Sequence, residues 1–234
     1  MRIAILGGTG QQGPGLALRW ARHEEIVIGS RQQEKADRVS GELNARLGEN
    51  LIRGLVNRRA AEEADVVVMT VPYGAHKATL GDVREALKGK IFIDTTVPLD
   101  PERPTQIRST SGGSAIEEAQ EFLGPDTHVA GAFQTVSFTL LQDLDHPVEG
   151  DVLVCSDYKD AREMGMHLAR LCGFRALDGG PARNARVVEG LTALFIHLNR
   201  RYKVKHAGFR VTGLEESERL APPRERPEPS RPGA

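Results

Sequence analysis

The stretch RIAILGGTGQQG, residues 2–13, decides the fold of this chain. Its first half is a run of apolar residues, and its second half contains the glycine spacing GxGxxG at Gly8, Gly10 and Gly13. An amphipathic segment follows directly. A buried strand, a glycine-rich turn and a helix in this order are typical of dinucleotide-binding folds. The alternative is a glycine-rich turn that binds no ligand.

Each glycine has a separate role in such a turn. Gly8 permits the tight turn, Gly10 lets a pyrophosphate approach the backbone, and Gly13 allows the helix to pack closely on the strand. The N-terminus of the helix offers free N–H groups and a partial positive charge to the phosphates. Thr9 adds a hydroxyl donor. The turn therefore predicts a phosphate-binding loop.

Beyond the loop, short runs rich in Val and Ile alternate with helical patterns. We expect strands over residues 2–6, 25–29, 51–55, 66–71 and 90–94, and helices over residues 12–22, 32–47, 59–64 and 76–87. Nearly continuous apolar runs suit parallel strands that are covered on both faces. The alternation predicts an α/β fold, with a Rossmann-type parallel sheet and right-handed crossovers.

The pattern changes after about residue 128. Apolar runs at 128–137 and 151–155 precede helical stretches at 161–171 and 185–202. The last helical stretch carries a wide apolar stripe, which consists of Val187, Val188, Leu191, Leu194, Phe195 and Leu198. This stripe packs either against a second subunit or in the core of its own chain. Residues 215–234 are rich in Pro, Arg and Glu, a composition that predicts a disordered tail.

Composition and charge exclude several classes of protein. The chain has 31 basic and 32 acidic residues, so its net charge of -1 gives no general attraction to nucleic acid. It has no apolar run near the roughly 20 residues that span a bilayer, and no signal peptide, so we expect a cytoplasmic protein without a membrane partner. The histidines have spacings that fit no metal site, and we expect Cys155 and Cys172 to be buried thiols.

The end of the second predicted strand indicates which dinucleotide binds. An NAD enzyme tends to place an acid there for the ribose 2′-hydroxyl. This chain has Ser30 and Arg31 instead, with Lys35 one helical turn further on. Arg grips a phosphate with its planar fork, Lys supplies a point charge, and Ser adds a neutral donor. We therefore predict NADP(H) as the cofactor, the alternative being a solvated basic helix face.

Two other strand ends are small, apolar and stiffened by proline. They are Thr70–Tyr73, which contains Val71 and Pro72, and Thr95–Pro98, which contains Val97. In an open α/β sheet the ligand lies at the carboxyl ends of the strands. We expect these two ends to form a rigid wall for the nicotinamide ring.

Several motifs, in order, resemble the family of NADPH-dependent reductases of the deazaflavin coenzyme F420, or F420:NADP oxidoreductases. They are MRIAILGGTG at 1–10, IGSR at 28–31, MTVP at 69–72, IDTTVP at 93–98, GAFQTVS at 131–137, DHPVEGDVLVCSD at 145–157, ARVVEGLT at 185–192 and KHAGFRVTGL at 205–214. The resemblance covers essentially residues 1–214.

The resemblance implies a homodimer, in which an NADP-binding Rossmann domain at 1–150 is followed by a small C-terminal domain at 151–214. It implies that NADP is held by Thr9, Gly10, Gln11, Gln12, Ser30, Arg31 and Lys35, with Val71, Pro72 and Val97 around the nicotinamide. The glycine spacing adds Gly8 to these cofactor-binding residues. Archaeal members carry a histidine where this chain has Gln134, so we assign no proton-transfer role to that side chain.

The implied reaction is hydride transfer between NADP(H) and coenzyme F420, which the two cofactors perform themselves. We therefore name no catalytic acid or base. The anionic tail of F420 has candidate partners in Arg183, Arg186, Arg200, Arg201, Lys203 and Lys205, which equally suit a solvated basic helix end. Two other functions stay open: an NADPH-dependent reductase of a flavin or ferric acceptor, and a non-catalytic NADP sensor.

Overall fold

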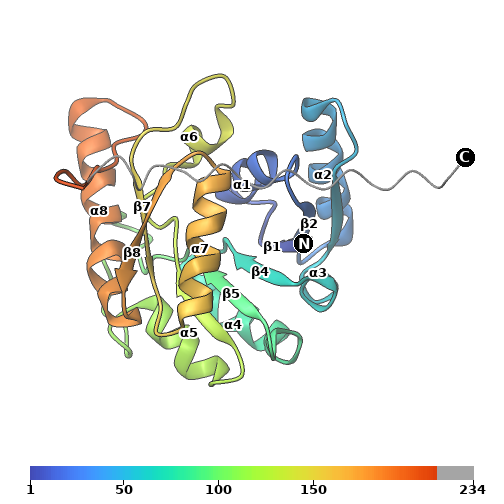
Figure 1. The fold of residues 1–234 in the computed structure, drawn as a ribbon, viewed down its shortest axis with the longest axis horizontal. Helices are drawn as coiled ribbons and strands as arrows, with labels where there is room; N and C mark the ends of the chain where they lie inside the picture. The colour runs from blue at the N-terminus through green and yellow to red at the C-terminus, as the bar shows by residue number, and fades with distance from the viewer. Residues whose placement is uncertain (215–234) are drawn as a thin grey trace, which may run out of the picture.

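The computed structural model describes residues 1–214, so the predicted tail at 215–234 lies outside the described residues. One eight-stranded sheet runs through the molecule in the order β3-β2-β1-β4-β5-β6-β7-β8 (Figure 1). Its strands are β1 Arg2–Leu6, β2 Glu25–Ser30, β3 Ile52–Val56, β4 Val66–Met69, β5 Ile91–Asp94, β6 His128–Gly131, β7 Asp151–Cys155 and β8 Arg175–Gly180.

Helices connect most of these strands. They are α1 Gln12–Trp20, α2 Gln33–Leu47, α3 Asn57–Glu63, α4 Tyr73–Val83, α5 Ala115–Leu123, α6 Phe138–Gln142, α7 Lys159–Leu171 and α8 Ala185–Tyr202, with short 3₁₀ helices at Arg84–Leu87 and Ala182–Asn184. α2 and α8 lie at opposite ends of the molecule (Figure 1).

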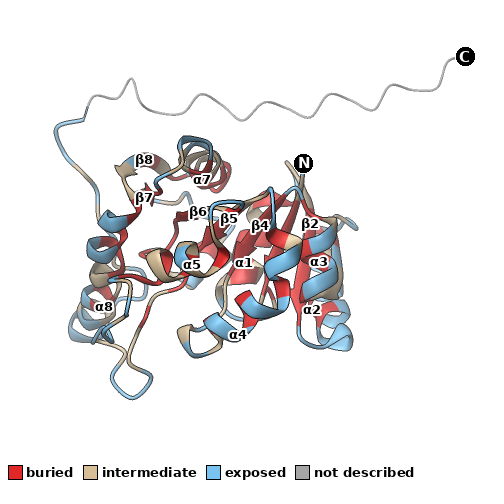
Figure 2. Cartoon of the chain, turned by 90° about the horizontal axis from the view of Figure 1, so that it is seen from below, coloured by how far each residue is buried: buried red, intermediate tan, exposed pale blue. Residues whose placement is uncertain are grey.

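The two faces of the sheet bury separate cores because successive side chains of a strand point to opposite faces. In β1, Ile3 and Ile5 pack into a core with α1, α2 and α7, whereas Ala4 and Leu6 pack into a second core with α3, α4, α5 and α8. Figure 2 shows the buried strands between helices whose outer faces are exposed. This three-layer arrangement confirms the predicted Rossmann-type α/β fold.

The order of the strands places the ligand site. β1 pairs in parallel with β2 on one side and with β4 on the other. The chain therefore turns outward in opposite directions from β1, and the loops at the carboxyl ends of β1 and β4 diverge. In doubly wound sheets the crevice at this switch point is where ligands bind.

The C-terminal strands extend the same sheet. β6 joins β7 in antiparallel fashion through the pair Gly131 and Cys155, and β7 pairs in parallel with β8 after the α7 crossover. The strands on both sides of residue 150 thus belong to one sheet, while the division into two domains at that residue stays a prediction.

Most predicted elements are confirmed, with small changes at their ends. The fourth strand ends at Met69 rather than at residue 71, and β6 covers only residues 128–131. Three elements were not predicted from the sequence, namely α5, α6 and β8. Cys155 and Cys172 are buried free thiols, as predicted. Within residues 1–214, none of the helices combines the length and apolar character needed to cross a bilayer.

A candidate dinucleotide site at the carboxyl ends of the strands

The glycine-rich loop folds as the sequence predicts. Gly8 donates its N–H to the carbonyls of Ile5 and Gly29 at 3.1 and 3.0 Å, which closes a tight turn after β1. A Cβ on Gly8 would lie 2.6 Å from the Ile5 oxygen, and one on Gly13 would lie 2.5 Å from the Cα of Gly8. A larger residue at position 13 would push the start of α1 away from the loop, and one at position 8 would clash with the end of β1. Gly10 also belongs to the loop, but it lies on its exposed side.

A cavity of about 530 Å³ opens beside this loop, at the carboxyl ends of β1, β2, β3 and β4. It is lined by Gly7, Thr9, Gly10, Ser30, Arg31, Gln32, Lys35, Asn57, Thr70, Val71, Pro72, Ala75 and Thr79. Seven of the eleven predicted cofactor residues are in this lining. The structure therefore brings together the loop, the basic group after β2 and the first wall of the expected nicotinamide site.

The charges around the cavity suit a phosphate. Its lining contains Arg31 and Lys35 but no Asp or Glu. Neither cation takes part in an ion pair within the described residues, although Glu34 lies between them in the sequence. Both cations also lie at or just before the first turn of α2, where the helix dipole disfavours positive charge. A bound anion would satisfy both side chains and the end of the helix.

Ser30 completes this basic group. Ser30 is 5 % exposed, and its hydroxyl oxygen accepts a hydrogen bond from the Gln32 N–H at 3.3 Å. The hydroxyl proton has no acceptor among the described residues, so it is available to a ligand. These features fit the phosphate-bearing ribose of NADP better than the bare ribose of NAD.

The other four predicted residues lie outside the cavity lining. Gly8 is buried beneath the loop, and Gln11 is exposed, with its carbonyl accepting from Gln142 at 2.8 Å. Val97 is half-buried beyond the end of β5. Gln12 has a structural contact that its sequence position does not reveal, because its side chain connects two strand ends.

The Gln12 amide joins β5 to the segment after β6. Its Nε2 donates to the Phe133 carbonyl at 3.0 Å, and its Oε1 accepts from the Thr95 hydroxyl at 2.9 Å. Phe133 has a φ of 65°, a left-handed conformation that is uncommon for a bulky residue, and its ring packs edge-on against Trp20. Such strain persists where surrounding contacts hold it, and it is frequent at functional sites.

Sequence reasoning missed a buried pair of titratable side chains at the end of β5. His76 on α4 and Asp94 are 3 % and 0 % exposed, and Nε2 of His76 lies 2.6 Å from Oδ2 of Asp94. The other carboxylate oxygen accepts the Thr96 N–H at 2.9 Å. Burial opposes protonation of His76, but the Asp94 carboxylate outweighs it, so the pKa of His76 lies above its usual value. The pair ties α4 to the end of β5.

A second buried acid lies near this pair. Glu189 on α8 is 2 % exposed, and its carboxylate accepts the N–H groups of Ala115 and Ile116 at the start of α5. Burial raises the pKa of Glu189 to about 8, in spite of these two hydrogen bonds. Both features have one weak sign in the sequence, since Asp94 and Glu189 stand within otherwise apolar stretches.

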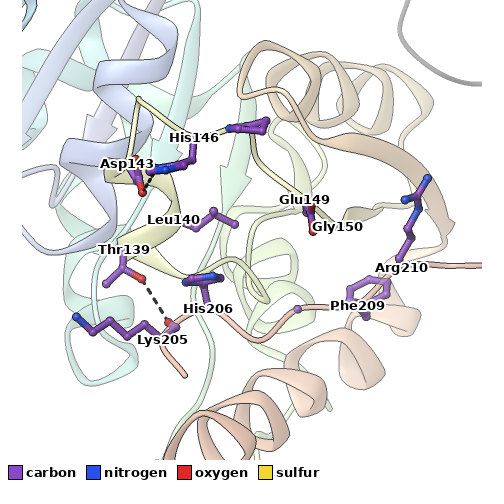
Figure 3. Close-up of a pocket in the computed structure, with 12 residues that line it drawn as sticks. Thr139, Leu140, Asp143, His146, Glu149, Gly150, Lys205, His206, Phe209 and Arg210 are labelled. Atoms are coloured by element: carbon purple, nitrogen blue, oxygen red, sulfur yellow. Dashed lines mark hydrogen bonds and ion pairs between the residues drawn. The ribbon is translucent and has the colours of Figure 1, made fainter. Parts of the chain in front are cut away.

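Another cavity, of about 750 Å³, lies away from the glycine loop. Figure 3 shows it between α6, the loop at 143–150 and the segment at 205–210. Asp143 and Glu149 share its lining with Lys205 and Arg210, and Asp143 already pairs with His146 at 2.9 Å. Its charges are thus mixed, and none of the eleven predicted cofactor residues lines it.

Two features of α8 bear on earlier alternatives. Arg186, a candidate for the F420 tail, pairs with Glu117 at 2.7 Å, so a ligand would have to compete with that carboxylate.

The apolar stripe of α8 is partly buried in the core of its own chain and partly exposed, where a second subunit could cover it. Val188 is 4 % exposed and packs in the core, whereas Val187 is 69 % and Leu194 is 49 % exposed.

The fold and the cavity together define a Rossmann-type dinucleotide-binding protein, with two cations in the cavity lining after β2. A family model described as NADP oxidoreductase, coenzyme F420-dependent, matches residues 2–98. The F420-dependent NADP reductase of Methanothermobacter marburgensis is 45 % identical over 92 % of this chain and 100 % of its own length. The chain belongs to the family of F420-dependent NADP reductases.

Two more distant similarities complete the comparison. A metalloreductase of Rattus norvegicus is 28 % identical over 81 % of this chain, but the match covers only 36 % of that protein. The crystal structure of a protein from Arthrobacter sp. FB24, described as a candidate F420-dependent NADP reductase, superposes with a TM-score of 0.77 at 24 % identity, over 90 % of this chain and 98 % of that one. This structural likeness supports the fold.

Proposed function

We propose that this protein transfers a hydride between NADP(H) and the deazaflavin coenzyme F420. The observation that carries the proposal is the cavity beside the glycine loop, where Arg31 and Lys35 stand without an acidic partner in the described residues. Membership of the F420-dependent NADP reductases supports the second cofactor.

The residues that we propose for NADP follow the cavity. The pyrophosphate lies on the loop of Gly8, Thr9, Gly10, Gln11 and Gln12, and the 2′-phosphate lies against Ser30, Arg31 and Lys35. Val71, Pro72 and Val97 pack around the nicotinamide. The positions of Thr9, Gly10, Val71 and Pro72 in one lining support this assignment. The loop and strand-end geometry suit a rigid, extended dinucleotide.

When bound, the nicotinamide and the deazaflavin supply the hydride chemistry themselves. The chain therefore has to hold the rings with the reacting carbons about 3 to 3.5 Å apart and to exclude water. The cross-link from Gln12 to Thr95 and Phe133 stiffens the strand ends where we place the rings. The His76–Asp94 pair stiffens the same end of β5 from the other side. No acid or base among these residues needs to move a proton to the reacting carbons.

A spectrophotometric assay tests the function. Purified protein is mixed with oxidised F420 and NADPH, and the loss of the visible absorbance of the deazaflavin is followed, with NADH in a parallel sample. We expect rapid bleaching with NADPH and slow or no bleaching with NADH. Bleaching that is equally fast with both would contradict the NADP assignment.

The same assay distinguishes the alternatives. Turnover of NADPH with a flavin or a ferric complex, but not with F420, would favour a reductase of another acceptor. The similarity to a metalloreductase over only 36 % of that protein gives such a function little support. Binding of NADPH without turnover of any acceptor would favour a non-catalytic sensor.

We also propose that the chain forms a homodimer through α8. Val187 and Leu194 leave apolar area exposed on this helix, and a second subunit would cover it. Light scattering behind a sizing column should give twice the mass of one chain, and Leu194→Lys should shift it toward the monomer. An unchanged mass would place any interface elsewhere. The expected cytoplasmic location stays a prediction.

A further inference from the structure

Asn57 is a buried polar residue that the sequence analysis did not single out. It follows β3 directly, is 4 % exposed, and is one of the residues that line the cavity beside the glycine loop. β3 is the outermost strand on this side of the sheet, next to β2. Asn57 thus reaches the site from an element that carries none of the predicted cofactor residues.

One end of the Asn57 amide holds the phosphate loop. Its Oδ1 accepts the N–H of Gly7 at 3.2 Å. Gly7 has a φ of 68°, and a Cβ there would lie 2.5 Å from the Val71 side chain. The hydrogen bond therefore fixes a loop residue whose conformation is restricted by its neighbours.

The end of β2 leaves room for this amide. A Cβ on Gly29 would lie 2.7 Å from Oδ1 of Asn57, closer than real contacts allow. Gly29 is the residue before Ser30, which begins the basic group. The amide thus lies between the phosphate loop and the position where we place the 2′-phosphate.

The other end of the amide has no protein partner. Because Oδ1 must face the Gly7 donor, the orientation of the amide is fixed and Nδ2 is its free end. No acceptor for Nδ2 exists among the described residues. Asn57 is buried except where it lines the cavity, so this donor meets the cavity. A donor that faces a cavity in this way is available to an acceptor on a bound ligand.

We propose that Asn57 is a specificity-determining residue for NADP. Its Oδ1 holds the phosphate loop, and its Nδ2 donates a hydrogen bond to the phosphate-bearing ribose of the adenosine half. This inference rests on the proposed function, because it assumes that the cavity receives NADP. It adds a neutral donor from the start of α3, whereas Lys35 comes from α2.

Two nucleotide fragments test the role of each end of the amide. Adenosine 2′,5′-bisphosphate represents the adenosine half of NADP, and adenosine 5′-monophosphate represents that of NAD. Calorimetric titration of the full chain measures both affinities without F420 or turnover. Asn57→Asp keeps an acceptor for Gly7 but replaces the donor with a carboxylate. We expect its affinity for the bisphosphate to fall by about tenfold or more, and its affinity for the monophosphate to change much less.

Asn44→Asp is a matched control. The amide of Asn44 also joins two elements, since it hydrogen-bonds to the backbone of Leu51 and Ile52 across the α2–β3 turn. Asn44 does not line the cavity. This variant should bind both fragments as the unmodified protein does. Asn57→Ser, which removes the amide nitrogen without adding charge, provides a second variant and should show the same selective loss to a smaller extent.

The outcomes separate this inference from the proposed function. Equal loss of both fragments in Asn57→Asp and Asn57→Ser would show a purely structural role, and unchanged affinities would show no role, so either result overturns the inference. If the unmodified protein itself fails to prefer the bisphosphate, the assignment of NADP fails instead.

Discussion

Two regions of the site differ in how their titratable side chains are paired. At the ends of β1, β2 and β3, the cations Arg31 and Lys35 stand at a cavity without acidic partners in the described residues. At the end of β5, the titratable side chains of His76 and Asp94 are buried and hydrogen-bond to each other. The first region, the open region, can bind an anionic ligand. The second, the closed region, consists of the buried His76–Asp94 pair and holds the end of β5 in place.

The two regions make different contributions to the site. Unpaired cations are strongly hydrated and cost little to keep at a surface, so they serve recognition. A buried pair adds little net stability over apolar residues, but removing one partner is expensive, so it fixes geometry. We therefore expect substitutions in the two regions to have different effects, on ligand affinity in the first and on stability in the second.

The largest expected effect is on the closed region. Asp94→Ala leaves His76 buried without its partner and removes the acceptor for the Thr96 N–H. We expect a loss of about 3 to 5 kcal/mol in the free energy of unfolding, measured by urea denaturation. Replacing both residues, as His76→Phe with Asp94→Ala, should recover part of this loss. A single variant as stable as the unmodified protein would show that the pair is dispensable.

The second prediction concerns the pH dependence of stability. The folded-state pKa values of His76 and Glu189 are both raised, that of Glu189 to about 8. The folded protein thus binds more protons than the unfolded chain, and the stabilisation is complete at low pH and lost as pH rises. For Glu189 the loss extends from its ordinary value of 4.5 to about 8.

Thermal unfolding between pH 5 and 9 measures this effect. Each proton that is released on unfolding contributes a slope of at most about 1.4 kcal/mol per pH unit. Glu189→Gln keeps a carbonyl acceptor for the start of α5 but cannot titrate, so its stability should depend less on pH. An identical pH profile in the variant would contradict the assignment of the slope to Glu189.

The third prediction concerns the open region. Arg31→Ala should weaken NADPH by roughly ten- to a hundredfold and NADH much less, because only NADPH carries the 2′-phosphate. Lys35→Ala should act in the same direction with a smaller effect, since Lys offers a point charge rather than a fork. Fluorescence titration of both cofactors measures the affinities. Equal weakening of NADPH and NADH would contradict the phosphate contact.

The smallest expected effect is on the exposed ion pairs away from both regions. Arg38→Ala removes a surface pair with Glu42 on α2, whose side chains are 61 % and 58 % exposed. Such pairs contribute about 0 to 1 kcal/mol. Stability and cofactor affinity should therefore stay close to those of the unmodified protein, which makes this variant a control for the loss of a positive charge on α2.

The open region could largely be predicted from the sequence. Its residues are consecutive or one turn apart in two segments, 7–13 and 30–35, so a local pattern is enough to identify them. The closed region could not, because its contacts join residues far apart. His76 and Asp94 come from different elements, and the two hydrogen-bond partners of the Gln12 side chain are 83 and 121 residues further along the chain.

The same reason explains the elements that the sequence did not predict. β8 ends in the glycines of ALDGG, and α6 has only five residues, so neither carries a clear period. Asn57 is a similar case, since an isolated asparagine after a strand is usually part of a turn. Only the packing of β2 against β3 shows that its amide reaches the phosphate loop.

The most direct test of the account is the rate of F420 bleaching by Arg31→Ala, measured in a stopped-flow instrument over a range of NADPH concentrations. If the open region only recognises the cofactor, the concentration for half-saturation rises by about ten- to a hundredfold, while the rate at saturation stays close to that of the unmodified protein. If the rate at saturation falls and the half-saturating concentration does not change, Arg31 acts on the hydride-transfer step, and the separation of the two regions is wrong.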